Sequence, residues 1–313
     1  MRVFQNANYQ FLSMRRPAYF ASAAVITIGL LSIIFRGGLR TGVEFTGGVL
    51  LEVQFSQTTD VGEIRDALTA GGTTGVQIQQ LRTVGAETND FLLRVPVGEE
   101  EDQNAIRDQI RASLETRYSA GSFEIARGDT LSAKVGDEFQ RTAVIAVLLS
   151  FFLTLIYLAF RFEWRFGVAA VIATVHDMLI TFGFISLFDI EINLATVAAI
   201  LTIIGYSLND TIVVFDRVRE NLRKKRKEPY DATLNRSLNE TLPRTVLTSG
   251  TTLIALLSLV VIGGAVIRPF AGVLIIGVLI GTYSSIFVAS PVLVEIHERA
   301  RRRAAIAART SRA

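Results

Sequence analysis

The segment IIGYSLNDTIVVFDR (residues 203–217) places a carboxylate, Asp210, inside an apolar run that extends from Leu194 to Phe215. A run of about 20 apolar residues is long enough to cross a bilayer as a helix. An unpaired carboxylate in hydrocarbon costs about 2.5–3.5 kcal/mol even on the lenient insertion scale. A carboxylate at this depth therefore indicates a functional site within a membrane helix.

The composition of the whole chain is that of a membrane protein. Of its 313 residues, 50% are hydrophobic, and the mean hydropathy is +0.40, which is too high for an ordinary soluble protein. The net charge is only +3, so we expect no binding to nucleic acid. The absence of cysteine excludes disulfides and thiolate metal sites, and two histidines are too few for a histidine-rich site. We therefore expect neither a metal nor another cofactor.

Hydropathy predicts six membrane-spanning helices with one long polar insertion after the first. Arg15, Arg16 and Pro17 precede the first apolar run. No small-x-small cleavage site follows it, which favours an uncleaved helix over a signal peptide. The predicted spans are residues 18–35, 142–160, 166–188, 194–216, 245–267 and 269–294.

Basic residues gather on one side of these spans. Residues 217–244 hold nine Lys and Arg, and the tail at 298–313 holds six more. With the N-terminus and the turn at 161–165, this side carries 20 of the 32 cations, which predicts that it is cytoplasmic. We therefore predict a basic cytoplasmic loop, a basic cytoplasmic tail and two cytoplasmic termini. The chain then divides into residues 1–35, an outside domain at 36–141, spans two to six at 142–297 and the tail.

The outside domain has the pattern of a small α+β fold. Short apolar or alternating segments predict strands, and two amphipathic stretches between them predict helices. The order β-α-β-β-α-β is that of a ferredoxin-like sandwich. We see no catalytic cluster in it and expect it to contact a polypeptide. The predicted strands are residues 49–55, 76–81, 91–95 and 122–127, and the helices follow Asp60 and contain Ile106 to Tyr118.

Polar side chains form one stripe on each of the third, fourth and fifth spans. On the fourth span the stripe falls within an arc of about 160°, at about 100° per residue. Because a polar stripe facing lipid is costly, we expect the three stripes to face one another or a partner. Their members are Thr174, His176, Asp177 and Thr181, then Thr202, Tyr206, Ser207, Asn209 and Asp210, then Arg244, Thr248, Thr251 and Thr252.

Asp210 is the predicted proton carrier. Arg244 begins the fifth span, and its long side chain can extend toward Asp210. A carboxylate that alternates between a guanidinium and a desolvated environment binds and releases a proton. Each charge moved across the membrane yields about 2.3 kcal/mol per 100 mV, enough to bias a domain motion. The expected supporting polar network is Asp177, His176, Asn209, Ser207, Tyr206 and Thr248.

Other interpretations of these groups are open. Asp210 could only pair helices within the bundle. Asp177 and Asp210 on neighbouring spans could form an intramembrane aspartyl protease, but neither has a Tyr-Asp or Gly-x-Gly-Asp context. Ser207 and His176 could form a serine–histidine dyad, but no oxyanion-hole glycine cluster accompanies them. We therefore expect that the protein is not an enzyme.

Two further segments predict packing and topology. Gly277, Gly281, Ser285 and Ala289 recur at four-residue spacing on the sixth span, as in close helix–helix contacts. The run RKKRK (223–227) is typical of a topology determinant and can also contact anionic lipid.

Four segments resemble the SecF family, and the resemblance extends from Met1 to about His297. TGVEFTGG (41–48) resembles the signature Gly-Ile-Asp-Phe-Thr-Gly-Gly, with Val and Glu in place of Ile and Asp. IGYSLNDTIVVFDRVREN (204–221) is similar to the most distinctive stretch of the family. ATVHDMLITFG (173–183) and LPRTVLTSGTTL (242–253) are similar to its third and fifth spans.

The resemblance implies a bundle of the resistance–nodulation–division type in the bacterial inner membrane. A separate SecD polypeptide would supply six further spans, and the complex would use the proton-motive force to help SecYEG export preproteins. YajC, YidC and membrane lipid are further candidate partners. The family's essential intramembrane aspartate and arginine correspond to Asp210 and Arg244. The alternative is a stand-alone proton-coupled exporter of small molecules or lipid, for which the outside domain is small.

Overall fold

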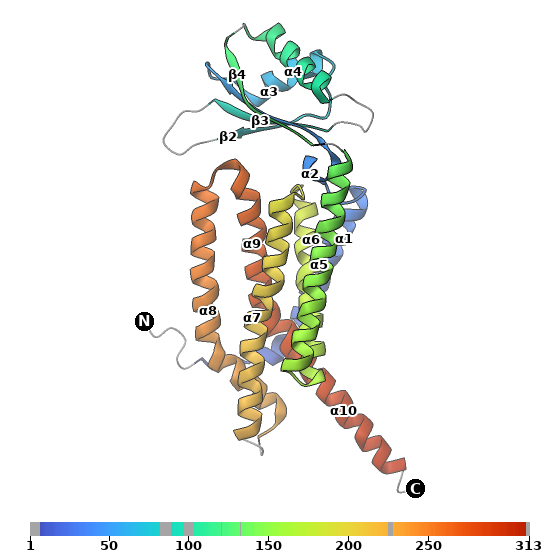
Figure 1. The fold of residues 1–313 in the computed structure, drawn as a ribbon. Coiled ribbons are helices and arrows are strands. Elements are labelled where there is room, and N and C mark those ends of the chain that lie inside the picture. Colours follow the sequence, from blue (N-terminus) through green and yellow to red (C-terminus); the bar gives the residue numbers. More distant parts are fainter. Residues whose placement is uncertain are drawn as a thin grey trace.

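A computed structural model describes residues 7–81, 89–96, 103–119, 121–131, 133–224 and 228–310. An α+β domain is stacked on one end of a helical bundle (Figure 1). Six helices in the described residues are long and apolar enough to cross a membrane, which confirms the predicted class. They are Phe11–Phe35, Lys134–Arg161, Trp164–Leu187, Leu194–Lys224, Tyr230–Ile262 and Ile267–Ile306.

The first five spans are each built on one α-helix, and the sixth is a composite. A short 3₁₀ helix, η1 (Phe11–Met14), precedes the first span, and a π-helical segment interrupts the sixth. The α-helices of the five spans are α1 (Arg15–Phe35), α5 (Ala133–Arg161), α6 (Trp164–Leu187), α7 (Leu194–Lys224) and α8 (Tyr230–Ile262). The sixth consists of α9 (Gly264–Ser284), η2 (Ser285–Ala289) and α10 (Ser290–Thr310).

Two predicted boundaries are wrong. The described part of the basic segment 217–244 is mostly helical, because α7 continues to Lys224 and α8 begins at Tyr230, while residues 225–227 lie outside the described residues. Its charges extend these helices and pair with one another, for example Lys224 with Glu220 one turn earlier. The turn between the fifth and sixth spans lies at Gly263, not near residue 268. The residues on both sides of this turn are apolar, so the hydropathy of the sequence did not reveal where the fifth span ends.

The α+β domain has the predicted ferredoxin-like topology. Its antiparallel sheet has the strand order β2-β3-β1-β4, and both helices cover the face that points away from the bundle (Figure 1). Alternate residues of β1, such as Leu51 and Val53, are fully buried against Ile64 and Leu114 of the helices. The elements are β1 (Gly48–Phe55), α3 (Val61–Ala70), β2 (Gln77–Leu81), β3 (Asp90–Pro96), α4 (Gln103–Arg117) and β4 (Phe123–Leu131).

A one-turn helix, α2 (Val43–Thr46), leads from the first span into β1. Gly47 has φ 76° and Gly48 has φ 153°, values that favour glycine. The start of α5 packs closely here, because a Cβ on Gly136 would lie 2.7 Å from the carbonyl oxygen of Phe45. The glycine pair therefore lets the chain turn tightly into the sheet beside the second span.

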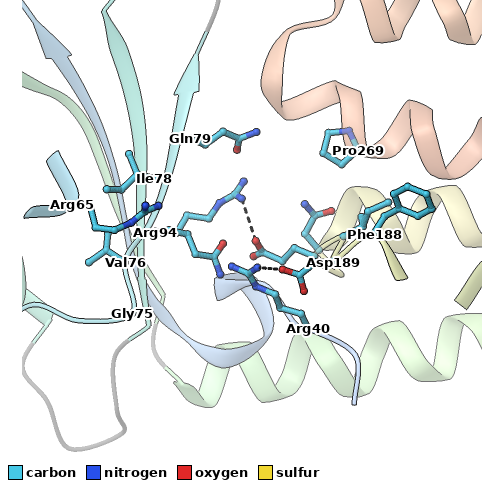
Figure 2. Close-up of a pocket in the computed structure, with 14 residues that line it drawn as sticks. Arg40, Arg65, Gly75, Val76, Ile78, Gln79, Arg94, Phe188, Asp189 and Pro269 are labelled. Carbon is cyan, nitrogen blue, oxygen red and sulfur yellow. Dashed lines mark hydrogen bonds and ion pairs between the residues drawn. The ribbon is translucent and has the colours of Figure 1, made fainter. Parts of the chain in front are cut away.

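Ion pairs join the domain to the turn between α6 and α7 (Figure 2). Arg94 on β3 pairs with Glu191 at 3.4 Å, and both side chains are only 12% exposed. Arg40 pairs with Asp189 at 2.7 Å on the rim. These groups line a cavity of about 560 Å³. Burial raises the pKa of Glu191, against the opposing charge of Arg94, and the carboxylate of Glu44 raises it further.

We predict that Arg94→Gln weakens the docking of the α+β domain on the α6–α7 turn. Removing the ion-pair partner of the buried Glu191 costs about 1–3 kcal/mol, so hydrogen exchange of the β2 and β3 amides speeds up. Because docking raises the pKa of Glu191, acid protonates this carboxyl and slows the exchange again. Arg111→Gln is the control, since Arg111 forms an exposed pair with Glu115. Equal exchange rates in the two variants would contradict the role of this ion pair.

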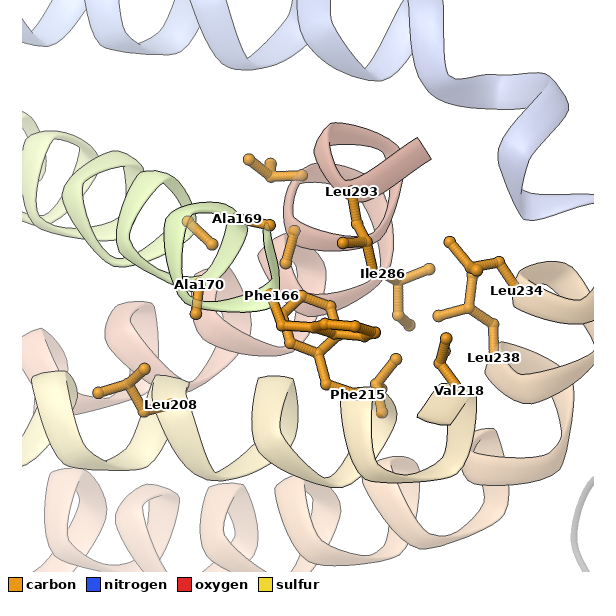
Figure 3. Close-up of a cluster of buried hydrophobic side chains, with 14 of the residues drawn as sticks. Phe166, Ala169, Ala170, Leu208, Phe215, Val218, Leu234, Leu238, Ile286 and Leu293 are labelled. Atoms are coloured by element: carbon orange, nitrogen blue, oxygen red, sulfur yellow. The ribbon is translucent and has the colours of Figure 1, made fainter. Parts of the chain in front are cut away.

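The bundle has two apolar clusters, one where α6, α7, α8 and η2 meet (Figure 3) and one between α6, α7, α8 and α9 next to the α6–α7 turn. Phe166 of α6 stacks edge-on against Phe215 of α7, with ring centroids 5.3 Å apart. Leu238 of α8 and Ile286 of η2 pack around them. This core fixes α6, α7, α8 and the sixth span relative to one another.

Helices α7 and α9 approach closely along the predicted small-residue stripe. A Cβ on Gly281 would lie 2.9 Å from Cβ of Ser207, and a Cβ on Gly277 would lie 2.2 Å from Cγ1 of Ile203. The stripe therefore packs within the bundle, against the helix that carries Asp210.

Gly281→Ala is expected to lower the free energy of unfolding by about 1–3 kcal/mol, because the added methyl group overpacks the α7 contact. Gly272→Ala on the same helix is the matched control, since a Cβ there meets nothing within 4 Å. Thermal unfolding in lipid nanodiscs measures both. Equal free energies of unfolding for the two variants would contradict the tight packing of α9 against α7 at Gly281.

Candidate functional site

Asp177 is the centre of a buried polar cluster on α6. It is fully buried, and its Oδ1 lies 2.8 Å from Nδ1 of His176. Its Oδ2 accepts hydrogen bonds from Ser284 at 2.7 Å and from Ser207. Three hydrogen-bonding atoms, one from each of three helices, therefore surround one buried carboxyl group.

The cluster extends from Asp177 to the first span. Nε2 of His176 lies 2.9 Å from Oγ of Ser22, which lies 3.1 Å from the hydroxyl of Tyr283. That hydroxyl donates to the carbonyl oxygen of Ala18 at 2.9 Å. The last residue of α9, Ser284, stands directly before the π-helical segment η2. Such segments are frequent at functional sites, because they change which side chains face the interior.

Asp210 lies on α7, one turn after Ser207, and has a sparser environment. Only 3% of its surface is exposed, yet its contact with Oγ of Ser249 is long, at 3.5 Å. Ser249 is itself 2.6 Å from Thr282 and 3.4 Å from the hydroxyl of Tyr206. The carboxyl group is therefore buried between α7, α8 and α9 with weak hydrogen bonding, unlike Asp177.

The other predicted site residues lie outside these two clusters. Arg244 is exposed on α8 and forms no ion pair with Asp210 among the described residues, although its positive charge acts on that carboxyl group. At about 1.5 Å per residue, it lies about one and a half turns from Ser249. Asn209 is exposed, and Thr248 is half-buried and accepts from Thr252 through its carbonyl oxygen. The third and fourth stripes thus meet at Asp177. The predicted stripe of the fifth span does not contact Asp210 directly, and the contact from α8 comes from its neighbour Ser249.

Five residues of the site were not predicted from the sequence. Ser249 and Thr282 contact one another beside Asp210, and Ser22, Tyr283 and Ser284 complete the Asp177 cluster. Each is a hydroxyl in a largely apolar span, and most such hydroxyls bond their own backbone. The geometry also does not form the alternative serine–histidine dyad. Ser207 donates to Asp177, and Nε2 of His176 contacts Ser22.

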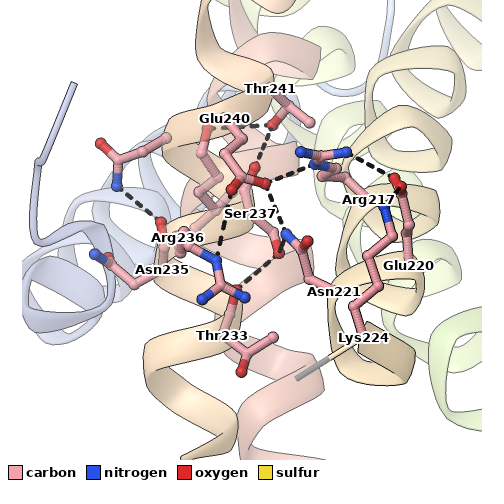
Figure 4. A network of polar contacts seen from close by, with 12 residues as sticks. Arg217, Glu220, Asn221, Lys224, Thr233, Asn235, Arg236, Ser237, Glu240 and Thr241 are labelled. Atoms are coloured by element: carbon pink, nitrogen blue, oxygen red, sulfur yellow. Dashed lines mark hydrogen bonds and ion pairs between the residues drawn. The ribbon is translucent and has the colours of Figure 1, made fainter. Parts of the chain in front are cut away.

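A polar network fixes the basic end of α7 (Figure 4). Glu240 of α8 accepts from Arg217 at 2.6 Å and from Asn221 at 2.7 Å. Asn239 pairs with both backbone groups of Tyr9, at 2.8 and 2.9 Å, and so holds the chain that precedes η1. The α7–α8 hairpin is thus a rigid unit at this end.

Family models match two parts of the chain. The model described as Protein export membrane protein SecD/SecF, C-terminal, matches residues 110–299, and the SecD/SecF GG motif matches residues 32–59. The two models together cover the linker after the first span and most of the membrane bundle.

Curated relatives and solved structures point to the same family as the family models. Protein translocase subunit SecF of Gemmatimonas aurantiaca is 47% identical over 96% of this chain and 90% of its own length. The same subunit of Rhodothermus marinus is 41% identical over 98% of this chain and its own full length. A crystal structure of SecDF, a translocon-associated membrane protein from Thermus thermophilus, matches with TM-score 0.77 and 35% identity, over 95% of this chain and 40% of that one. The chain therefore belongs to the SecF family of protein translocase subunits, multi-pass proteins of the bacterial membrane.

Proposed function

We propose that the chain is the six-span partner of a SecD polypeptide in a proton-driven complex that helps SecYEG export preproteins. The observation that carries this proposal is Asp210, a nearly buried carboxyl group whose hydrogen bond with Ser249 is long. A weakly solvated carboxyl group in an apolar bundle favours its neutral form, and a nearby cation favours the charged form. Small movements around Asp210 would therefore bind or release a proton.

The membrane face around Asp210 supports the SecD partner. Asn209 of α7 and Arg244 of α8 are exposed on the bundle surface. Thr202 and Thr251 are exposed as well, but their hydroxyls donate to their own helices. Polar groups in lipid are costly unless a partner covers them. The SecDF chain of Thermus thermophilus is more than twice as long as its matched part, so it has room for a second bundle. In this chain SecD would be a separate polypeptide that covers this face.

Arg244 and Asn209 would act when that interface forms. Arg244 lies toward the basic end of α8, and its side chain is free of ion pairs among the described residues. A turn of the helix or a shift of SecD would bring its guanidinium toward Asp210 and favour release of the proton. Asn209, beside Asp210, would orient water or a SecD side chain at the entrance.

Movement would reach the α+β domain along two connections. Helix α5 runs from the end of β4 into the membrane, and the α6–α7 turn carries Glu191, which pairs with Arg94 of the sheet. Only two residues separate Glu191 from the start of α7. A shift of α7 at Asp210 would thus change the docking of the domain, which would hold or release the preprotein.

The remaining parts of the proposal concern topology and partners. The basic ends of α7, α8 and α10 would face the cytoplasm, with both termini, in the inner membrane. YajC and YidC are candidate accessory partners, and the run RKKRK (223–227) would contact anionic lipid. The work is mechanical, so we propose no enzymatic activity.

Asp210→Asn is expected to reduce export of a secreted reporter to the level of a strain that lacks the chain, because the amide cannot carry a proton. Arg244→Ala is expected to act in the same direction. Asp231→Asn, at the exposed start of α8, is the control for the loss of one carboxylate. Normal export with Asp210→Asn in a strain without other copies would contradict proton coupling. A purified chain that never associates with SecD would favour the stand-alone exporter.

A further inference from the structure

The chain of contacts from Asp177 to Ala18 constrains where protons lie. It contains four consecutive contacts: Asp177 with His176, His176 with Ser22, Ser22 with Tyr283, and Tyr283 with the carbonyl oxygen of Ala18. All four measure between 2.8 and 3.1 Å. Contacts of this length between polar atoms require one hydrogen each, because two lone pairs facing one another repel.

The direction of each hydrogen bond follows from the carbonyl end. The oxygen of Ala18 can only accept, so the hydroxyl of Tyr283 donates to it. The contact between Ser22 and Tyr283 then needs the hydrogen of Ser22. Ser22 consequently has none left for Nε2 of His176, and this nitrogen must donate to Ser22.

A neutral histidine beside a charged aspartate supplies one hydrogen too few. Ser22, Tyr283 and a neutral ring contribute one hydrogen each, but the chain has four contacts. One additional proton on the His176–Asp177 pair satisfies all four. The two serines that donate to Oδ2 of Asp177 leave the Oδ1–Nδ1 contact as the place where this proton is shared.

We infer that His176 and Asp177 together bind one proton and form a proton-binding site separate from Asp210. Both side chains are buried, at 7% and 0% exposure, and a shared proton makes the pair neutral as a unit. A lone buried carboxylate would instead be strongly destabilised. Every other polar side chain that contacts the pair in the described part of the chain is a hydroxyl, from α1, α7 or α9.

The site is connected to the helix that carries Asp210. Ser207 bonds to Asp177 and lies one turn before Asp210 on α7, where Gly281 of α9 approaches it closely. A proton gained or lost at the pair would therefore shift the same turn of α7. Occupancy of the pair does not depend on the proposed function, whereas its use in proton coupling rests on it.

Nitrogen-15 NMR of the full chain in lipid nanodiscs tests the inference at atomic level. The chain has two histidines, so a His297→Gln background leaves His176 as the single labelled ring. Nε2 of His176 is expected to carry a hydrogen at neutral pH, whether the shared proton lies nearer the ring or the carboxyl group. An Nε2 without hydrogen in this background would overturn the inference.

Tyr283→Phe is the matched variant, because the phenyl ring keeps the stacking on Phe287 and on His176. The substitution removes the hydroxyl oxygen of Tyr283 that accepts the hydrogen bond from Ser22. The Ser22 hydroxyl then donates to Nε2 of His176 instead. The population of protonated Nε2 is expected to fall at least severalfold, and Ser22→Ala should lower it as well. Unchanged protonation in both variants would also overturn the inference. Asp210→Asn leaves this signal intact, so the test is independent of the export experiment.

Discussion

The burial of two carboxyl groups on neighbouring membrane helices is the constraint on which the rest of the bundle depends. Each must be neutralised or hydrogen-bonded within the protein, because lipid offers neither water nor counterions. Asp177 meets this need with three partner side chains and a histidine-shared proton. Asp210 meets it only weakly, through Ser249, and is therefore the group whose ionisation is most easily changed by movement.

The packing around the carboxyl groups explains how such a change can travel. Gly281 brings α9 against α7 at Ser207, so neither helix can shift alone. The Glu240 network ties α7 to α8 at the basic end, and the Arg94–Glu191 pair ties the α6–α7 turn to the sheet at the other. A rigid helix held at both ends converts a local rearrangement into a displacement of the domain.

The sequence predicted the fold well because hydrophobic periodicity reports burial directly. The six spans and the ferredoxin-like order of strands and helices followed from spacing, as did the expectation that the stripes of the third and fourth spans face one another. Residues 217–244 were mistaken for a loop, since charged helix ends and loops have the same composition. Hydroxyls such as Ser22 and Ser249 could not be predicted as site residues, because only tertiary contacts distinguish them from hydroxyls that bond their own helix.

Movement of the α+β domain driven by the ionisation of Asp210 is the central claim. The chain has no cysteine, so spin labels can be placed at single introduced cysteines, one on exposed α4 and one on the exposed end of α8. The distance between them, measured in SecD-containing vesicles, is predicted to change when a proton gradient is imposed and to stay fixed in Asp210→Asn. The same distance change in both proteins would contradict the account.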